Sequence, residues 1–452
     1  MEKKALNRRG FIKSSVCGAI GTVSVPAFIT GCTSTAKKEG GTQLKEVEVP
    51  VLPDRAPDGK PLKAGLVGCG GRGTGAAIDF LSAGNGLSIV ALGDVFADKL
   101  TACRQKLKDQ GMDIPDDKCF LGFDAYQKVI DSDVDLVLLC TPPVFRPLHF
   151  EYAIEKGKHC FIEKPCAVDP VGARRILATA KRAEAKGLSV ISGTIRRSQK
   201  DCVETYRRVA GGAIGRIVSA HVIRHGGALW HIKRKPGWTD MEYMLRNWVN
   251  FCWTSGDLVV EQFVHEIDMM TWFLGDVHPV KAEATGGRQR RVTGDMYDFF
   301  SIEYLYENGM HTHCTSRQIG GCDSDHSILV YGTEGYTNCF DTIFNPDGSV
   351  AWKYPHPKEG DADQSMAVLN PFVAEHVRLV AAIRTNKPVN DADKHVQSTL
   401  IAMMGRMSAY TGKFVTWDEM MASTLKLGPE TYAFGPVPGI PEEIPLAGTA
   451  AE

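Results

Sequence analysis

The sequence has no excess of charge of either sign and no long apolar run. It has 52 lysines and arginines against 53 aspartates and glutamates, whereas a nucleic-acid binder normally carries a basic surplus. No apolar stretch reaches the roughly 20 residues that a transmembrane helix needs, and no internal repeat occurs. With 43% hydrophobic and 23% charged residues over 452 positions, the composition indicates a globular chain of two or three domains.

The 13 cysteines lack the paired spacing of zinc sites and redox motifs. No CxxC pair occurs, and the eleven cysteines beyond residue 32 are scattered from Cys69 to Cys339, many of them in apolar runs. Buried free cysteine behaves as a small hydrophobic residue. We therefore expect neither a structural metal site nor a disulfide framework.

The first 31 residues have the pattern of an export signal. Asn7-Arg8-Arg9-Gly10-Phe11-Ile12-Lys13 resembles a twin-arginine signal, and a mildly apolar stretch follows over 14–30. The segment 29–32, Ile-Thr-Gly-Cys, resembles a lipobox, in which Cys32 becomes the acylated first residue. This order predicts a periplasmic or outer-membrane-associated lipoprotein, held to the membrane only through Cys32. A frayed amphipathic helix is the alternative. Residues 32–60 predict a flexible tether.

A glycine-rich turn follows the first apolar run, which covers 64–67. Residues 68–73 read Gly-Cys-Gly-Gly-Arg-Gly and lead into a helical pattern. In such a turn Gly68 permits the tight bend, Gly70 lets the backbone approach a pyrophosphate, and Gly73 lets helix pack on strand. A second apolar run ends at Asp94, about 20 residues on, where an acid binds the ribose hydroxyls and disfavours a 2′-phosphate. The pattern predicts a dinucleotide site for NAD rather than NADP; a glycine-rich turn without cofactor is the alternative.

Strands and helices continue to alternate up to residue 193. The run 134–140 is apolar throughout, as expected for a strand of a parallel sheet covered on both faces. Further strands are expected at 159–162 and 188–192, and helices at about 147–156 and 170–186. Six such alternations predict a doubly wound Rossmann domain over 61–193. Beyond it, strands at 217–224, 299–304 and 311–314 follow one another without helices between them, which favours an open, largely antiparallel sheet.

The order of these motifs resembles the Gfo/Idh/MocA oxidoreductases. The resemblance is carried by 68–73, Asp94, Thr141-Pro142-Pro143 and, most specifically, Glu163-Lys164-Pro165. It covers about 61–420 and implies an α/β fold: a Rossmann domain, a C-terminal α+β substrate domain over 194–425, and an extended tail over 426–452. In that family an exposed sheet face commonly dimerises, which leaves a homo-oligomer open. The residues to which the resemblance assigns the cofactor are Gly68, Gly70, Gly71, Arg72, Gly73, Asp94, Thr141, Pro142, His149, Glu163 and Lys164.

The stretch 247–275 carries the expected chemistry. Asp257, Glu261 and His265 are four residues apart, so a continuous helix would place them on one face, which Asp268 extends. An alcohol loses a hydride and a proton on oxidation, and an imidazole is suited to take the proton. We therefore predict His265 as general base, Glu261 as its orienting or hydroxyl-binding partner, and Lys164 as the cation that stabilises the alkoxide. A metal held by Asp257, Glu261 and His265 is a weaker alternative, and we predict no metal.

Further side chains are of the types that bind sugars. Arg196 and Arg197 follow the last Rossmann strand and, by the resemblance, face the junction of the domains. Trp230 and Trp238 lie in a basic, aromatic loop, and tryptophan faces stack on sugar rings. We predict Arg196, Arg197, Trp230, Trp238, Asp257 and Asp268 as substrate-binding residues; packing at a domain interface is the alternative for the tryptophans.

Three functions compete. The first is an exported NAD-dependent oxidoreductase acting on a ring hydroxyl of a sugar, glycoside or cyclitol, with the 3-hydroxyl as one candidate. Because the twin-arginine route carries folded proteins and free NAD is scarce outside the cytoplasm, the cofactor would be tightly bound and regenerated in place. The second is an NAD-dependent glycoside hydrolase that oxidises transiently and eliminates. The third, a non-enzymatic sugar-binding lipoprotein, gives no reason for Lys164 and His265 to occur together.

Overall fold

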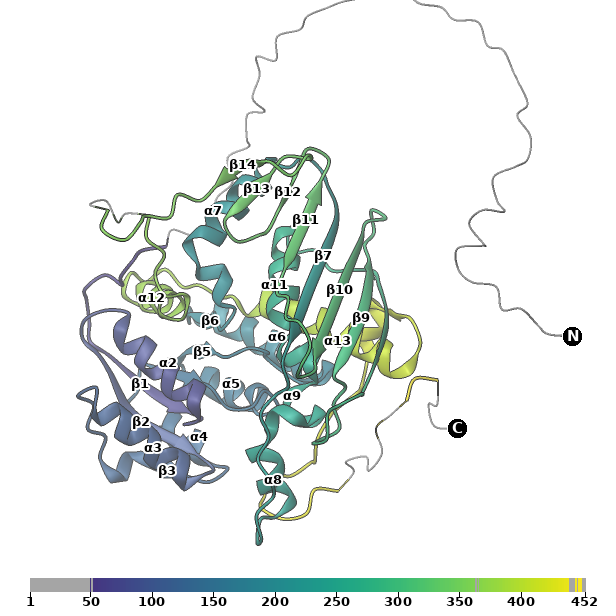
Figure 1. The fold of residues 1–452 in the computed structure, drawn as a ribbon. Helices are drawn as coiled ribbons and strands as arrows, with labels where there is room; N and C mark the ends of the chain where they lie inside the picture. The colour runs from purple at the N-terminus through teal and green to yellow at the C-terminus, as the bar shows by residue number, and fades with distance from the viewer. Residues whose placement is uncertain are drawn as a thin grey trace, which may run out of the picture. The chain divides into compact units, whose positions relative to one another are not determined.

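The computed structural model describes residues 49, 52–361, 364, 366–438, 444 and 446–448. The predicted export signal, Cys32 and most of the tether lie outside the described residues. All described residues belong to one compact unit, Leu44–Glu452 (Figure 1). None of the helices described in this unit is long and apolar enough to cross a membrane.

A six-stranded parallel sheet forms the first half of this unit. Its strand order is β3-β2-β1-β4-β5-β6, the doubly wound order with β1 and β4 at the switch point. Strands run β1 (Leu62–Val67), β2 (Leu87–Asp94), β3 (Cys119–Leu121), β4 (Leu136–Leu139), β5 (His159–Ile162) and β6 (Val190–Ser192). The helices between them are α2 (Gly71–Ser82), α3 (Ala97–Lys108), α4 (Ala125–Ile130), α5 (Arg146–Glu155) and α6 (Pro170–Ala185).

The apolar run of β4 is buried on both faces, as its sequence predicts. Val137 and Leu139 pack with α4, α5 and α6, whereas Leu136 and Leu138 pack with α2 and α3. The second of these layers is completed from far along the chain, because α12 (Pro371–Arg384) packs against α2 and β6. Arg384, the last residue of α12, donates to the backbone carbonyls of Pro57 and Asn85. The Rossmann layer is therefore completed by residues of the second half.

The second half is built on a nine-stranded sheet of order β14-β13-β12-β11-β7-β10-β9-β8-β15. All neighbours are antiparallel except β7 and β10, which run parallel in the centre. The predicted fold class, a Rossmann domain with a largely antiparallel second sheet, is confirmed. The strands are β7 (Ile217–Gly226), β8 (Lys281–Gly287), β9 (Phe299–Leu305), β10 (His311–Gln318), β11 (Ile328–Gly332), β12 (Tyr336–Thr337), β13 (Thr342–Phe344), β14 (Val350–Lys353) and β15 (Val415–Thr416).

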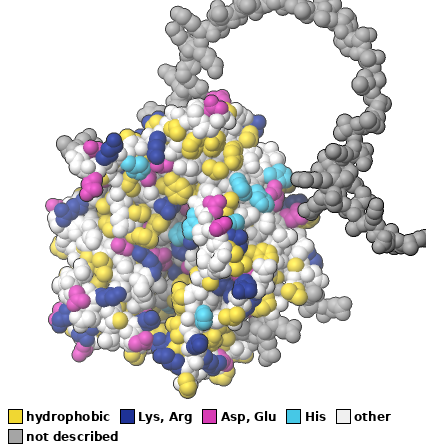
Figure 2. Space-filling view, viewed as in Figure 1, with side chains coloured by type: hydrophobic (Ala, Val, Ile, Leu, Met, Phe, Trp, Pro, Cys, Tyr) yellow, Lys and Arg dark blue, Asp and Glu magenta, His cyan; other side chains and the backbone are white. Residues whose placement is uncertain are grey.

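Helices cover one face of this sheet. The 20-residue α13 (Ala392–Thr411) packs between β8 and the Rossmann helix α6, and α11 (Val264–Phe273) packs on β7 and β11. The remaining helices are α7 (Lys200–Ala210), α8 (Asp240–Arg246), α9 (Cys252–Ser255), α10 (Leu258–Glu261) and α14 (Trp417–Ala422). The other face is open, and His311 and His313 of β10 are exposed on it beside Glu303. Histidine side chains gather at the upper right of the molecule in Figure 2.

The expected continuous helix from Asp257 to Asp268 does not exist. Asp257 is the N-cap of the single-turn α10, and its φ of 84° and ψ of 169° lie in a region that side chains rarely adopt. Gln262 and Phe263 keep helical backbone angles but form a turn that separates α10 from α11, which begins at Val264. Helical spacing therefore fails over this stretch, and Asp257 does not share a face with His265.

Candidate active site

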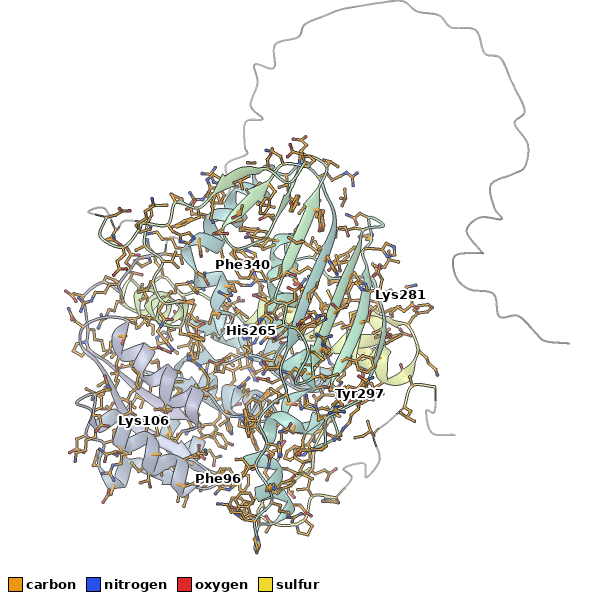
Figure 3. All side chains as sticks on the ribbon, viewed as in Figure 1. Phe96, Lys106, His265, Lys281, Tyr297 and Phe340 are labelled. Atoms are coloured by element: carbon orange, nitrogen blue, oxygen red, sulfur yellow. The ribbon has the colours of Figure 1, made fainter. Side chains whose placement is uncertain are left out.

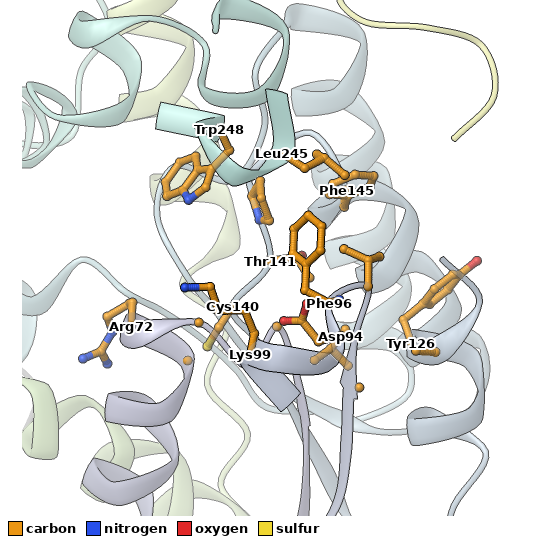
Figure 4. Close-up of a pocket in the computed structure, with 18 of the residues that line it drawn as sticks. Arg72, Asp94, Phe96, Lys99, Tyr126, Cys140, Thr141, Phe145, Leu245 and Trp248 are labelled. Carbon is orange, nitrogen blue, oxygen red and sulfur yellow. Dashed lines mark hydrogen bonds between the residues drawn. The ribbon is translucent and has the colours of Figure 1, made fainter. Parts of the chain in front are cut away.

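A cavity of about 500 Å³ lies at the carboxyl edge of the parallel sheet, at the switch point between β1 and β4. Such crevices are where doubly wound sheets bind ligands. One wall is the Rossmann domain, from Gly68 to His149. The opposite wall comes from the second half, where Leu245 and Trp248 face the sheet across the opening (Figure 4).

The glycine turn fits a dinucleotide pyrophosphate. Gly68 has a φ of 97°, and a side chain on Gly73 would meet the Gly68 carbonyl oxygen at 1.8 Å, so both positions exclude any larger residue. At Gly70 and Gly71, by contrast, an added Cβ would meet nothing within 4 Å. These two glycines line the cavity at the N-terminus of α2, where backbone N–H groups favour an anion. The bare backbone there leaves room for a phosphate group.

Asp94 ends β2 and lines the same cavity. Its carboxylate accepts hydrogen bonds from the backbone N–H groups of Cys69 (2.7 Å) and Phe96 (2.8 Å), which orient it toward the glycine turn. Burial raises its pKa, an effect that these backbone hydrogen bonds oppose. A carboxylate fixed at this position can accept from ribose hydroxyls, as the sequence predicts.

The cavity wall around Thr141 is polar, and the histidine in it, His149, is uncharged. The Thr141 hydroxyl lies 3.3 Å from Nδ1 of His149, whose ring stacks on Tyr126 at 4.1 Å between centroids. Burial and, to a smaller extent, the Arg146 charge lower the pKa of His149 to about 3, so the ring is neutral at physiological pH. Pro142 lines the cavity beside Thr141.

Arg72 connects the glycine turn to the Glu163-Lys164 segment. Its Nε donates to Oε1 of Glu163 at 2.6 Å, its Nη1 donates to Asp79 at 3.1 Å, and its guanidinium lies 4.6 Å from the Phe372 ring centroid. Glu163 also accepts from the Lys164 backbone N–H at 3.1 Å. The peptide bond between Lys164 and Pro165 is cis.

Lys164 reaches from the Rossmann domain into the second half. Its Nζ donates to the backbone carbonyl of Glu261 at 2.8 Å and to Oε1 of the same residue at 3.1 Å. Both side chains are largely buried, which strengthens the ion pair relative to one on the surface. The other oxygen of Glu261 accepts from the Gln262 amide. Glu261 thus fixes the position of the ammonium group.

His265 lies on the first turn of α11, between the two halves of the molecule (Figure 3). It is partly exposed and makes no hydrogen bond to the described residues. Burial lowers its pKa well below the usual value, and so do the charges of Lys164, Arg224 and Arg196, with a further contribution from His395. A neutral imidazole with a free ring nitrogen can accept a proton.

Three of the predicted substrate-binding residues have internal partners instead. Arg197 is buried and forms hydrogen bonds of 3.0 Å to both carboxylate oxygens of Asp268, which also accepts from Ser398 at 2.6 Å. Asp257 is fully buried and accepts from the Tyr410 hydroxyl at 2.5 Å. Burial raises the Asp257 pKa to about 6. In the structure Arg197, Asp257 and Asp268 thus help to hold α10, α11 and α13 together, and their role in substrate binding stays a prediction.

The other three predicted substrate-binding residues lie nearer to solvent. Trp230 lines the cofactor cavity and is half exposed, and Trp238 stacks between the cations of Lys235 and Arg246. Arg196 lies over the Phe340 ring at 5.0 Å and donates to Gln199. The charge of Arg196 acts on His265, whereas Trp238 contacts Arg246, which lines the cofactor cavity as Trp230 does.

Sequence reasoning missed several cavity residues. Phe96 lies two residues beyond Asp94, the carboxyl end of β2, so its place is a usable signal. No local pattern marks the residues that come from the second half, since their position depends on how the domains pack. The missed lining residues are Phe96, Lys99, Phe123, Tyr126, Phe145, Ile232, Leu245, Arg246 and Trp248.

Two family profiles match the chain. One, described as "Oxidoreductase family, NAD-binding Rossmann fold", matches residues 62–192. The other, described as "GFO/IDH/MocA C-terminal domain", matches residues 203–337. The chain belongs to the GFO/IDH/MocA oxidoreductase family. The family and the NAD cofactor predicted from the sequence are confirmed.

Named GFO/IDH/MocA relatives include dehydrogenases and hydrolases. Inositol 2-dehydrogenase 4 of Saccharopolyspora erythraea is 28% identical over 217 residues, which are 48% of this chain and 55% of that protein. A glycosyl hydrolase family 109 protein of Shewanella pealeana is 27% identical over 182 residues, 40% of this chain and 38% of that protein. In both cases the match covers less than two thirds of the relative.

Solved GFO/IDH/MocA structures share the fold. Myo-inositol 2-dehydrogenase from Lactobacillus plantarum has a TM-score of 0.59 at 19% identity and covers 79% of this chain and 99% of its own. Scyllo-inositol dehydrogenase from Lactobacillus casei, solved with NAD(H) and scyllo-inositol, has a TM-score of 0.59 at 19% identity and covers 80% of this chain and 100% of its own. At these identities the likeness is one of fold.

Proposed function

We propose that the protein is an exported NAD-dependent oxidoreductase that acts on a ring hydroxyl of a sugar, glycoside or cyclitol and keeps its cofactor bound. The observation that carries the proposal is the Lys164 ammonium group, which Glu261 holds at the carboxyl edge of the Rossmann sheet near neutral His265. The inositol dehydrogenases among the relatives support the same substrate class.

The residues of the chain divide the work of the reaction. Gly70, Gly71 and Asp94 would hold the pyrophosphate and ribose of NAD, whose nicotinamide would supply the acceptor for the hydride. The hydroxyl proton passes to a ring nitrogen of His265. Lys164 Nζ donates a hydrogen bond to the same oxygen and stabilises the negative charge that develops there. Glu261 keeps the ammonium group oriented while the substrate enters.

The second candidate is a glycoside hydrolase that oxidises a ring hydroxyl transiently, eliminates the glycosidic bond and returns the hydride. The family 109 hydrolase of Shewanella pealeana among the relatives favours it. The same Lys164 and His265 chemistry would begin both reactions, so the two differ in the product and not in the first step.

One experiment tests both candidates. The protein is incubated with inositols, free sugars and nitrophenyl glycosides, and the products are separated by mass spectrometry. A keto product, formed with reduction of the bound nicotinamide, supports the oxidoreductase, whereas free sugar without net reduction supports the hydrolase. No product from either class, in protein shown to hold NAD, would overturn the proposal.

Export is tested separately in cells. Replacing both Arg8 and Arg9 by lysine should leave the full-length protein in the cytoplasm, and Cys32→Ala should release it from the membrane fraction. An unchanged fractionation of both variants would contradict the lipoprotein assignment.

A further inference from the structure

The phenylalanines that line the adenosine end of the cofactor cavity are packed against residues from outside the Rossmann domain. Three phenylalanines surround this end: Phe96 after β2, Phe123 after β3 and Phe145 before α5. The segment Leu427–Val437, which we call the strap, packs against all three. The ring of Phe434 lies 6.0 Å from Phe96 and 5.2 Å from Phe123, and Tyr432 lies 4.8 Å from Phe145.

The strap is fixed at both ends. At its start, the Leu427 backbone N–H donates to the Asp169 carboxylate at 2.8 Å, and just before it Arg174 of α6 donates to the Ser423 carbonyl at 2.7 Å. Toward its end, the Gly435 carbonyl accepts from the Met241 backbone N–H of α8 at 3.1 Å, and Val437 is buried. The strap therefore joins the Rossmann domain to α8.

A second contact closes the same end of the cavity. Arg246, the last residue of α8, donates from both terminal nitrogens to the two oxygens of Asp98 on α3, at 3.1 and 3.0 Å. Its guanidinium lies 4.0 Å from the centroid of the Phe96 ring, and its Nε is held by Glu242 at 3.0 Å. A bidentate pair of this kind fixes geometry as well as adding energy. Leu245 and Arg246 both line the cavity.

We propose that the strap and the Arg246–Asp98 pair form a latch that retains NAD through successive turnovers. The proposal rests on the proposed function for NAD as a retained cofactor and adds the residues that retain it. Release of the adenosine half requires the phenylalanine contacts and the ion pair to open together, and such constraints act mainly on the dissociation rate. A retained cofactor carries the hydride until a carbonyl compound enters the same site and takes it back with a proton. The co-substrate is therefore a keto-sugar or another carbonyl compound and not free NAD.

The test measures cofactor release directly. The purified full-length protein is loaded with NADH, excess NAD is added, and the loss of bound NADH fluorescence gives the dissociation rate. Phe434→Ala and Arg246→Gln are compared with Phe414→Ala, a matched control at an exposed phenylalanine outside the strap. The nicotinamide that remains bound after gel filtration is counted by mass spectrometry.

We expect both latch variants to release NADH about tenfold faster or more, the factor that a loss of roughly 1.4 kcal/mol produces, while Phe414→Ala matches the parent. Asp98→Asn repeats the Arg246 test from the other partner if one variant folds poorly. Parent-like release from the folded latch variants, or release from the parent within seconds, overturns the proposal. If the protein retains NADH but oxidises no sugar, the latch is supported and the proposed function is overturned.

Discussion

Lys164 is the side chain whose removal tests the proposed chemistry most directly. Its ammonium group binds Glu261 and lies at the domain junction. We expect Lys164→Met to lower kcat by about 10²- to 10⁴-fold, the range for loss of one positioned catalytic group, with bound nicotinamide unchanged. Steady-state kinetics and nicotinamide content check this, with exposed Lys233→Met as the control. A variant that keeps half of its activity would remove Lys164 from the mechanism.

The pKa of His265 should set the acid limb of the pH profile of kcat/KM. A base acts only when neutral, and the pKa of His265 is lowered well below 6.5 by burial and by the neighbouring charges of Lys164, Arg224 and Arg196. The acid limb of kcat/KM should therefore fall below pH 6.5. Arg196→Gln removes one of these positive charges, so the His265 pKa rises and the limb moves to higher pH. A limb that moves to lower pH in this variant would contradict the assignment.

At the scale of elements, two glycines of the same turn should affect different properties. Gly73 should affect the stability of the fold, and Gly70 the binding of NAD. Gly73→Ala places a Cβ 1.8 Å from the Gly68 carbonyl, so we expect a loss of about 3 kcal/mol in unfolding free energy, measured by urea denaturation. Gly70 has extended backbone angles and open space around its Cβ position. Gly70→Ala should therefore keep the parent's stability and weaken NAD binding at least about tenfold. The reverse pattern would show that the turn does not hold the pyrophosphate.

Elements with a strong local pattern could be predicted from the sequence, and elements fixed by packing could not. The apolar strand β4 and the turn at Gly68 appear where their residues indicate, because burial on both faces and a positive φ each leave a local signature. The three-residue β3 is too short to show a period. The break at Asp257 is also invisible in the spacing, since Tyr410, 153 residues away, holds the carboxylate that caps α10.

The residues of the candidate site also divide into those with a local sequence pattern and those placed by tertiary packing. Lys164, Glu261, His265 and Asp94 could be proposed from the sequence because their neighbours resemble a family pattern. Trp248 and Arg246 reach the cavity through tertiary packing alone. The sequence could not show that Arg197 and Asp268 pair with each other, because a polar residue near a site has the same sequence signature whether it binds substrate or supports a helix.

For the whole molecule, buried neutral histidines predict acid sensitivity. Burial lowers the pKa of His149, His376 and His395 to about 3 each, against about 6.5 in the unfolded chain. Between these values the unfolded state binds protons that the native state excludes, so the unfolding free energy decreases as the pH falls from 6.5 toward 3. Each histidine contributes up to about 1.4 kcal/mol per pH unit to this decrease in the unfolding free energy.

The measurement compares variants, because carboxylates titrate over part of the same range. His376→Leu should reduce the pH dependence of the unfolding free energy between pH 6 and 4.5 by roughly 1 kcal/mol per unit. His311→Gln, at an exposed position on the open sheet face, serves as the control. An equal pH dependence in all three proteins would show that His376 accepts its proton without unfolding.

The late position of the strap in the chain has a consequence for biosynthesis. Helix α12, strand β15 and the strap all lie beyond residue 370, yet they complete the Rossmann layer, the edge of the second sheet and the cover of the cofactor cavity. The strap is synthesised after every residue that lines the cavity. A chain in which the strap has not yet docked therefore leaves Phe96, Phe123 and Phe145 without their partners, and we expect NAD to enter and leave such a chain more readily than the finished fold.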